Sequence, residues 1–137
     1  GYWGGVIPES LAAGDLPPLL SDPRVLGVKA FLSPLPASAG YASIDVNELE
    51  KTARAAVEAS KPLLVHCELM SPEEMRRLIA DAESRGDPPS SFETFLATRP
   101  PRFEREAIKA LLGVSSRMPS LRAHIVHLSD AGSLEMV

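Results

Sequence analysis

Three nitrogen-bearing side chains in this sequence lie toward the carboxyl ends of apolar runs, where they could hold a metal ion. Lys29 lies in VLGVKAF, His66 follows PLLV, and His127 follows HIV. Burying each of them costs free energy unless the side chain finds a partner. Imidazole is the commonest protein ligand for metals. Two histidines and a lysine at equivalent positions of separate apolar runs therefore favour a metal site.

Each of these side chains also has an ordinary structural explanation. A single His in a strand is more often a hydrogen-bonded core residue than a ligand, and Lys29 could extend its ammonium group out of a sheet while its stem is buried. Structural zinc is disfavoured, because the sequence has no C-x-x-C motif and no close His pair. Ser129 and Asp130 resemble a helix cap more than part of a hydrolase triad, since no nucleophile elbow accompanies them.

The segments that must position these residues alternate in character. Apolar, β-branched runs of this kind are typical of strands covered on both faces. The predicted strands cover residues 3–7, 24–32, 61–68 and 122–130. Amphipathic segments with helix-start signals lie between them, and this order predicts parallel βαβ units. The fold class is therefore α/β with a parallel sheet.

The predicted helices follow from spacing and capping residues. Asp45 and Ser71 are good N-caps, and Pro72 suits the first position of the second of these helices. A weak helix is predicted over 9–22 with Pro17 and Pro18 inside it. The stronger predicted helices cover residues 46–60, 72–84, 91–98 and 101–117, and residues 130–137 suggest the start of another.

In parallel α/β folds the carboxyl ends of the strands converge on the ligand site. Lys29, His66 and His127 should therefore meet at one mouth. Side-chain alternation predicts that His127 shares a strand face with Ile125, whereas His124 points the other way.

The same alternation applies to the strand that ends in VHCE. His66 and Cys67 should point to opposite faces, so they cannot form a Cys–His dyad, and Glu68 should share the face of His66. Trp3, beside Gly4 and Gly5, is expected to pack in the core, with a direct substrate contact as the less favoured alternative.

Composition narrows the class of protein. The chain has 137 residues, enough for one domain, and its formal net charge of −4 argues against nucleic acid or an anionic membrane as the main partner. No apolar run approaches the roughly 20 residues of a membrane span, so a soluble protein, with the cytoplasm favoured, is expected. The chain lacks an initial Met and ends inside a predicted helix, so we expect an internal fragment of a longer protein.

Family resemblance adds to these inferences. The stretches GYWGGVIPES, VLGVKAFLSP, KPLLVHCE, SFETFLATRPPRFEREAIKALL and HIVHLSDAGSLEMV together resemble allantoinases, which are cyclic amidohydrolases of the metal-dependent amidohydrolase superfamily. The resemblance covers essentially all of residues 1–137. It implies the middle portion of a (β/α)8 TIM barrel, with about four of its parallel strands.

The resemblance also implies a chemistry. Lys29 would react with carbon dioxide to form a carbamate bridging two divalent metal ions, most often Zn²⁺, and His66 and His127 would bind the second ion. Glu68 would orient His66 without touching the metal, and Ser33 would have a weak substrate-binding role. The implied reaction is hydrolysis of the hydantoin ring of allantoin to allantoate, a step of purine catabolism.

The sequence departs from the family pattern at two points. The family has an H-x-H pair on its first strand and a catalytic aspartate on its last, and neither lies in this chain. No catalytic residue is therefore assigned, and we expect residues 1–137 alone to be inactive. The complete protein is expected to be a homo-oligomer acting on a small molecule. Two alternatives stay open: another cyclic amidohydrolase, of the dihydropyrimidinase or dihydroorotase type, and a non-catalytic homologue that acts in assembly.

Overall fold

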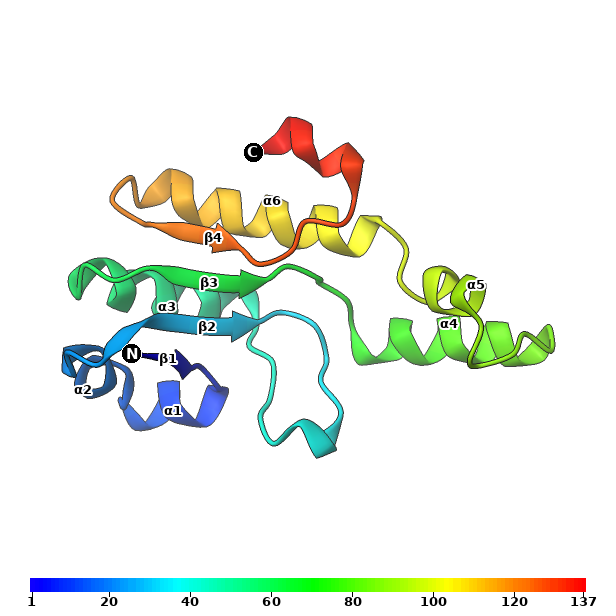
Figure 1. The fold of residues 1–137 in the computed structure, drawn as a ribbon, viewed down its shortest axis with the longest axis horizontal. Helices are drawn as coiled ribbons and strands as arrows, with labels where there is room; N and C mark the ends of the chain where they lie inside the picture. The colour runs from blue at the N-terminus through cyan, green and yellow to red at the C-terminus, as the bar shows by residue number, and fades with distance from the viewer.

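A computed structural model describes residues 1–137, apart from the side chain of Ala37. Four strands form one parallel sheet in the order β1-β2-β3-β4 (Figure 1). The strands are β1 (Tyr2–Gly5), β2 (Val25–Phe31), β3 (Leu63–His66) and β4 (Ala123–Ile125). The α/β fold with a parallel sheet, predicted from the sequence, is confirmed.

Helices connect each strand to the next. The α-helices are α1 (Pro8–Ala13), α2 (Leu16–Ser21), α3 (Val46–Glu58), α4 (Pro72–Ser84), α5 (Phe92–Ala97) and α6 (Arg102–Arg117). Two 3₁₀-helices are η1 (Ala37–Ala39) and η2 (Ala131–Met136). The last of these replaces the helix expected to begin near residue 130.

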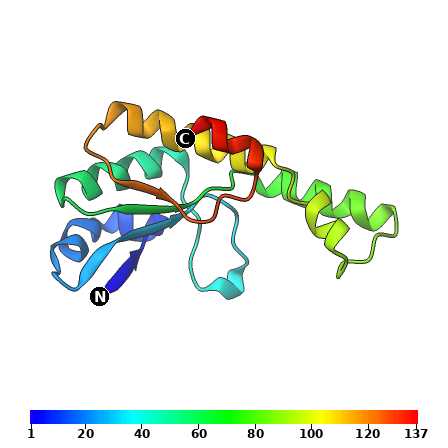
Figure 2. The same ribbon diagram turned by 45° about the horizontal axis from the view of Figure 1, so that its top comes forward.

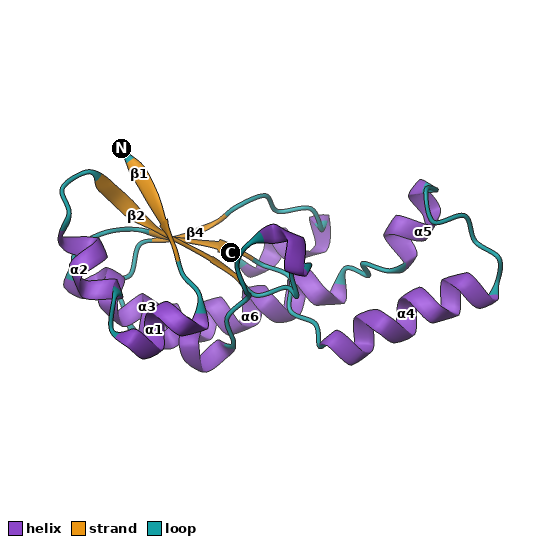
Figure 3. Cartoon of the chain, turned by 90° about the horizontal axis from the view of Figure 1, so that it is seen from below, coloured by secondary structure: helices purple, strands orange, loops and turns teal.

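The core lies between one face of the sheet and its helices. Figure 3 shows α1, α2, α3 and α6 on the same side of the strands. Val28 and Ala30 of β2 and Leu63 and Val65 of β3 point to that side and are fully buried. They pack with buried residues of the covering helices, which are Leu49, Ala53, Ala56, Ala107, Ile108, Leu111 and Val114. Removing this apolar area from water is the main force holding the layers together.

The opposite face of the sheet has no helical cover in the part of the chain that the structure describes (Figure 3). Trp3 lies on this face, opposite Gly27, and 47% of its surface is exposed. The prediction that Trp3 packs in the core is therefore wrong for this chain. A β-carbon at Gly27 would lie 2.7 Å from the Trp3 ring and 2.4 Å from the Pro62 carbonyl oxygen, so the close approach requires glycine there.

The single weak helix predicted over 9–22 is also wrong, because two helices occupy this segment. Gly14 ends α1 in the left-handed conformation, with φ of 76°. Pro17 and Pro18 then lie in the first turn of α2, where a missing backbone N–H costs little.

The two predicted N-caps begin their helices. The Asp45 carboxylate accepts a hydrogen bond from the Glu48 amide at 2.7 Å, and the Glu48 carboxylate accepts one from the Asp45 amide at 2.8 Å. This reciprocal pair is a capping box. Ser71 accepts from the Glu74 amide at 3.1 Å and begins α4.

Helices α4 and α5 form an arm that extends beyond the carboxyl ends of the strands (Figures 1 and 2). An ion pair between Glu74 of α4 and Arg102 of α6 joins the arm to the helix layer. None of the helices among the described residues is long and apolar enough to cross a membrane.

Candidate metal centre

Two of the predicted site residues meet at the carboxyl edge of the sheet. His66 is the last residue of β3, and His127 follows β4 by two residues. Their rings contact edge to face with centroids 4.5 Å apart, and His127 Nε2 lies 2.8 Å from His66 Nδ1. One imidazole at the end of β3 and one in the turn after β4 therefore face each other, nitrogen to nitrogen.

Glu68 contacts the other nitrogen of His66. Its Oε2 atom lies 3.0 Å from His66 Nε2. The hydrogen bond from His66 lowers the pKa of the Glu68 carboxyl group below its ordinary value, against the opposing effect of partial burial. A carboxylate on Nε2 favours a proton there and leaves the lone pair of Nδ1 directed at His127.

The prediction that strand alternation sets the direction of His127 is wrong. Strand β4 ends at Ile125, so strict alternation does not extend to residue 127. His127 has φ of 58°, in the left-handed region, and this turn brings its ring to His66. His124 pairs with Leu64 in the sheet, and Leu64 pairs with Lys29, so all three share the uncovered face.

Lys29 lies on the same face as His66, but further from the carboxyl edge of the sheet, because it pairs with Leu64, two residues before His66. It pairs with Gly5 of β1 and Leu64 of β3, whereas His66 pairs with Phe31. The Phe31 ring contacts both site residues: Lys29 Nζ lies 3.8 Å from its centre, and its centroid is 5.3 Å from that of His66. Lys29 therefore approaches the His pair through an aromatic ring and not by direct contact.

The environment of Lys29 affects its protonation. Partial burial lowers the pKa of the amine to about 8, and the nearby Cys67 opposes this shift. A lysine of this kind has more neutral amine near neutral pH than a lysine in water.

Cys67 and Ser33 lie away from the His pair. Cys67 points into the core, opposite His66, and burial together with the Glu104 carboxylate raises the pKa of its thiol to about 12. It therefore stays a protonated, inert thiol. Ser33 follows β2 and has only 5% of its surface exposed, so it offers little area to a ligand in this conformation.

A cleft of about 590 Å³ opens over the His pair. Its walls come from the ends of β3 and β4, from α5 and from the first turn of α6. The lining residues are His66, Glu68, Phe95, Leu96, Arg99, Pro100, Pro101, Glu104, His127, Ser129 and Asp130. The volume is in the range of small-molecule sites.

Glu104 was not predicted as a site residue. It lies in the first turn of α6, 7% exposed, and its two carboxylate oxygens accept hydrogen bonds from the amides of Ser129 at 2.8 Å and Asp130 at 2.5 Å. A signal was present in the sequence: Glu104 is four residues before Ile108, on the apolar stripe of its helix, where a charge requires partners.

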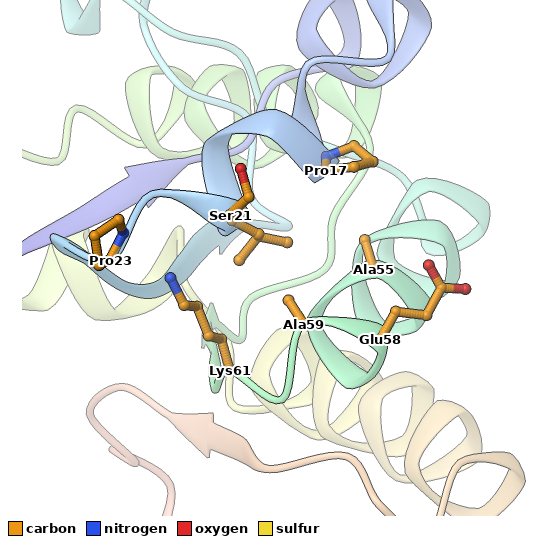
Figure 4. Close-up of a pocket in the computed structure, with 8 residues that line it drawn as sticks. Pro17, Ser21, Pro23, Ala55, Glu58, Ala59 and Lys61 are labelled. Atoms are coloured by element: carbon orange, nitrogen blue, oxygen red, sulfur yellow. The ribbon is translucent and has the colours of Figure 1, made fainter.

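A second cavity, of about 470 Å³, lies at the opposite edge of the sheet between α2 and α3 (Figure 4). Pro17, Ala55 and Ala59 contribute to its largely apolar wall, and Lys61 borders it. The Lys61 ammonium already donates to the Asp22 carbonyl at 2.8 Å. This cavity is at the amino ends of the strands, away from the edge where parallel α/β folds bind ligands.

The donor set at the His pair fits part of a metal site. Among the described residues there is no cluster of three or more His, Cys, Asp and Glu side chains arranged to hold a metal. The chain does supply two converging imidazole nitrogens, and the remaining nitrogen of His66 is held by a carboxylate. That pairing is typical of metal-ligating histidines.

Sequence comparison finds known proteins that match nearly the whole length of this chain. The chain is 32% identical over 139 residues to the allantoinase of Arabidopsis thaliana, which covers 97% of the chain and 26% of that protein. It is 31% identical over 138 residues to the mitochondrial allantoinase of Aquarana catesbeiana, covering 99% of the chain and 25% of that protein. The chain thus spans about a quarter of the length of these relatives. No family model matches it.

Solved structures give the same fold. An L-hydantoinase (dihydropyrimidinase) from Arthrobacter aurescens matches 98% of the chain and 28% of its own length, with a TM-score of 0.79 and 20% identity. A D-hydantoinase also matches 98% of the chain and 28% of its own length, with a TM-score of 0.78 and 25% identity. The predicted partial (β/α)8 barrel of about four parallel strands is confirmed. The expected resemblance to the allantoinases, cyclic amidohydrolases, is likewise confirmed for nearly the whole chain, which matches about a quarter of their length.

Proposed function

We propose that the complete protein containing this chain hydrolyses the hydantoin ring of allantoin to allantoate. The similarity to allantoinases over nearly all of the chain supports this substrate. In this proposal residues 1–137 form the middle portion of a barrel domain. The rest of the protein supplies the H-x-H pair and the catalytic aspartate that this sequence lacks.

The observation that carries the proposal is the convergence of His66 Nδ1 and His127 Nε2, 2.8 Å apart. In the proposed site these two nitrogens bind one divalent ion. Glu68 keeps the proton of His66 on Nε2, so that Nδ1 is free to act as a ligand. Bound divalent ions, most often Zn²⁺, would polarise the ring carbonyl and lower the pKa of a bound water.

Lys29 completes the site in this proposal. Its neutral amine attacks carbon dioxide, a bond forms between Nζ and the carbon, and one proton is released, leaving a carbamate anion. The partial burial of Lys29 supports this step, because it increases the fraction of neutral amine. Gly5, its strand neighbour, has open space beside its α-carbon, which favours room for the added carboxyl group.

The remaining assignments are smaller parts of the same proposal. Ser33 would contact substrate only after movement of the segment that follows β2, because it is buried here. We also propose that residues 1–137 alone are inactive, and that the complete protein is a homo-oligomer located in the cytoplasm.

The test is an assay of the complete protein with Zn²⁺ on allantoin, hydantoin, dihydrouracil and dihydroorotate. We expect the highest kcat/KM on allantoin, and a large loss of kcat/KM in His66→Ala and His127→Ala, because each variant removes a proposed metal ligand. Higher activity on dihydrouracil or dihydroorotate would assign the other type of cyclic amidohydrolase. Absence of both bound metal and activity on all four compounds would contradict the proposal and favour a role in assembly.

A further inference from the structure

The turn that carries His127 is held in an unfavourable backbone conformation. His127 is not glycine, yet its φ is 58°. Residues other than glycine rarely adopt this region, and such a conformation persists only when the surrounding structure holds it. The contacts of this turn therefore help to hold the His127 ring toward His66.

Two of these contacts come from Glu104. Both oxygens of its buried carboxylate are used, one by the Ser129 amide and one by the Asp130 amide. Hydrogen bonds to an ionised carboxylate are stronger than those between neutral groups. Because the two amides belong to consecutive residues, the carboxylate fixes the backbone two and three residues after His127.

The same turn of α6 also fixes the segment after His66. The Phe103 carbonyl oxygen accepts a hydrogen bond from the Leu69 amide at 2.9 Å. Phe103 is fully buried beside Glu104. The first turn of α6 thus holds the two chain segments that present His66 and His127.

A neighbouring ion pair is more exposed. Arg105 Nε lies 2.6 Å from Asp130 Oδ2, with the Arg105 side chain 46% exposed and the Asp130 side chain 11% exposed. Exposed ion pairs contribute little to stability. Arg105 contacts the Asp130 side chain, whereas Glu104 accepts from the amides of both Ser129 and Asp130, so we attribute the positioning of the turn mainly to Glu104.

We propose that Glu104 is a positioning residue for the metal centre: its carboxylate holds the turn at residues 127–130 so that His127 Nε2 faces His66 Nδ1. The effect on metal binding rests on the proposed function. The holding of the turn by Glu104 does not depend on it. Replacing a group that orients a metal ligand typically weakens metal binding by about 10- to 100-fold.

The test uses Glu104→Gln in the complete protein, with Zn²⁺ affinity measured by competition with a chromophoric chelator. We expect a loss of about 10- to 100-fold, because the amide side chain offers only one acceptor and sets its NH₂ group against a backbone N–H. Glu106→Gln is the matched control, since Glu106 lies on the same helix and is exposed, with an ion pair to Lys109. Unchanged Zn²⁺ affinity in Glu104→Gln would overturn the proposal.

Ile108→Val controls for a general loss of stability. Ile108 is fully buried one turn further along α6, so this variant should lower the unfolding temperature and leave Zn²⁺ affinity unchanged. A loss of Zn²⁺ affinity in Ile108→Val as large as that in Glu104→Gln would mean that Glu104 acts only through stability.

A measurement on the unaltered protein covers the case in which Glu104→Gln fails to fold. Amide hydrogen exchange should show strong protection at Ser129 and Asp130, although Ser129 is exposed. Exchange of both amides at the rate of an unstructured loop would overturn the inference. This readout requires neither metal nor activity, so it separates a failure of the positioning role from a failure of the proposed function.

Discussion

The two faces of the sheet are built from alternate residues of the same strands, and they differ in what covers them. Leu63 faces the helices and is fully buried, whereas the adjacent Leu64 lies on the uncovered face and is only partly buried. The covered face holds aliphatic residues that stabilise the fold. The other face and its rim hold Lys29, His66 and His124. In a closed barrel this second face lines the interior, so the difference separates the residues that hold the chain together from those available for chemistry.

The largest expected loss of stability comes from a substitution on the covered face. Leu63→Ala should lower the free energy of unfolding by about 3 kcal/mol, because it leaves a cavity between β3 and the helices. Leu64→Ala in the same 137-residue chain should cost about 1 kcal/mol, because less apolar area is lost. Urea unfolding of both variants measures the difference, and equal losses would contradict the assignment of the faces.

The same pair of variants sharpens the comparison in the complete protein. If the remaining strands close a barrel over Leu64, the cost of Leu64→Ala should rise toward that of Leu63→Ala, at about 2 to 3 kcal/mol. A cost that stays at its value in the shorter chain would indicate that this face is not covered.

After the Leu63 and Leu64 variants, the next largest effect concerns metal binding at the rim of the uncovered face. Glu68→Gln in the complete protein should weaken Zn²⁺ binding by about 10- to 100-fold, since it removes the charge that keeps the His66 proton on Nε2. Glu73→Gln is the control, because Glu73 is exposed on α4 and pairs with Arg76 at 3.7 Å. Equal Zn²⁺ affinities in the two variants would count against the role of Glu68.

A third and smaller effect concerns the helix layer behind the covered face. Asp45→Ala should lower the free energy of unfolding by about 1 kcal/mol, because the Glu48 amide of α3 loses its acceptor. Asp45→Asn keeps an acceptor and should cost less. Thermal unfolding distinguishes the two, and an Asn variant as unstable as the Ala variant would show that the cap is not responsible.

The smallest effect lies at the amino edge, in the turn before β2. Hydrogen bonds from the side chain and the amide of Arg24 lower the pKa of the Asp22 carboxyl group to about 2. Asp22 therefore contributes stability above its unfolded pKa near 3.8, and this contribution is lost as the pH falls toward 2. At pH 3, NMR should show Asp22 largely ionised in the native protein and largely protonated in Arg24→Ala. Equal ionisation in both proteins would disprove the coupling.

The covered face is the part of the molecule that sequence reasoning predicts best. Its strands are continuous apolar runs, and its helices begin at Asp45 and Ser71, so pattern and capping agree. The helix over 9–22 was predicted wrongly because Gly14 in the left-handed conformation ends α1 and two prolines begin α2.

The site is harder to predict, because it lies where regular structure ends. Alternation assumes that a strand continues, but β4 stops at Ile125 and a turn determines the direction of His127. The contribution of Glu104 depends on hydrogen bonds to residues 25 and 26 positions away in the sequence. Periodicity along one helix indicates that this carboxylate is buried but not which amides it meets.

The most direct test of a metal centre at His66 and His127 is a crystal structure of the complete protein grown with Zn²⁺, with anomalous scattering measured at the zinc edge. We expect an anomalous peak about 2.1 Å from both His66 Nδ1 and His127 Nε2, with Glu68 still on His66 Nε2. Two imidazoles that stay hydrogen-bonded to each other, with zinc absent or bound elsewhere, would contradict the account.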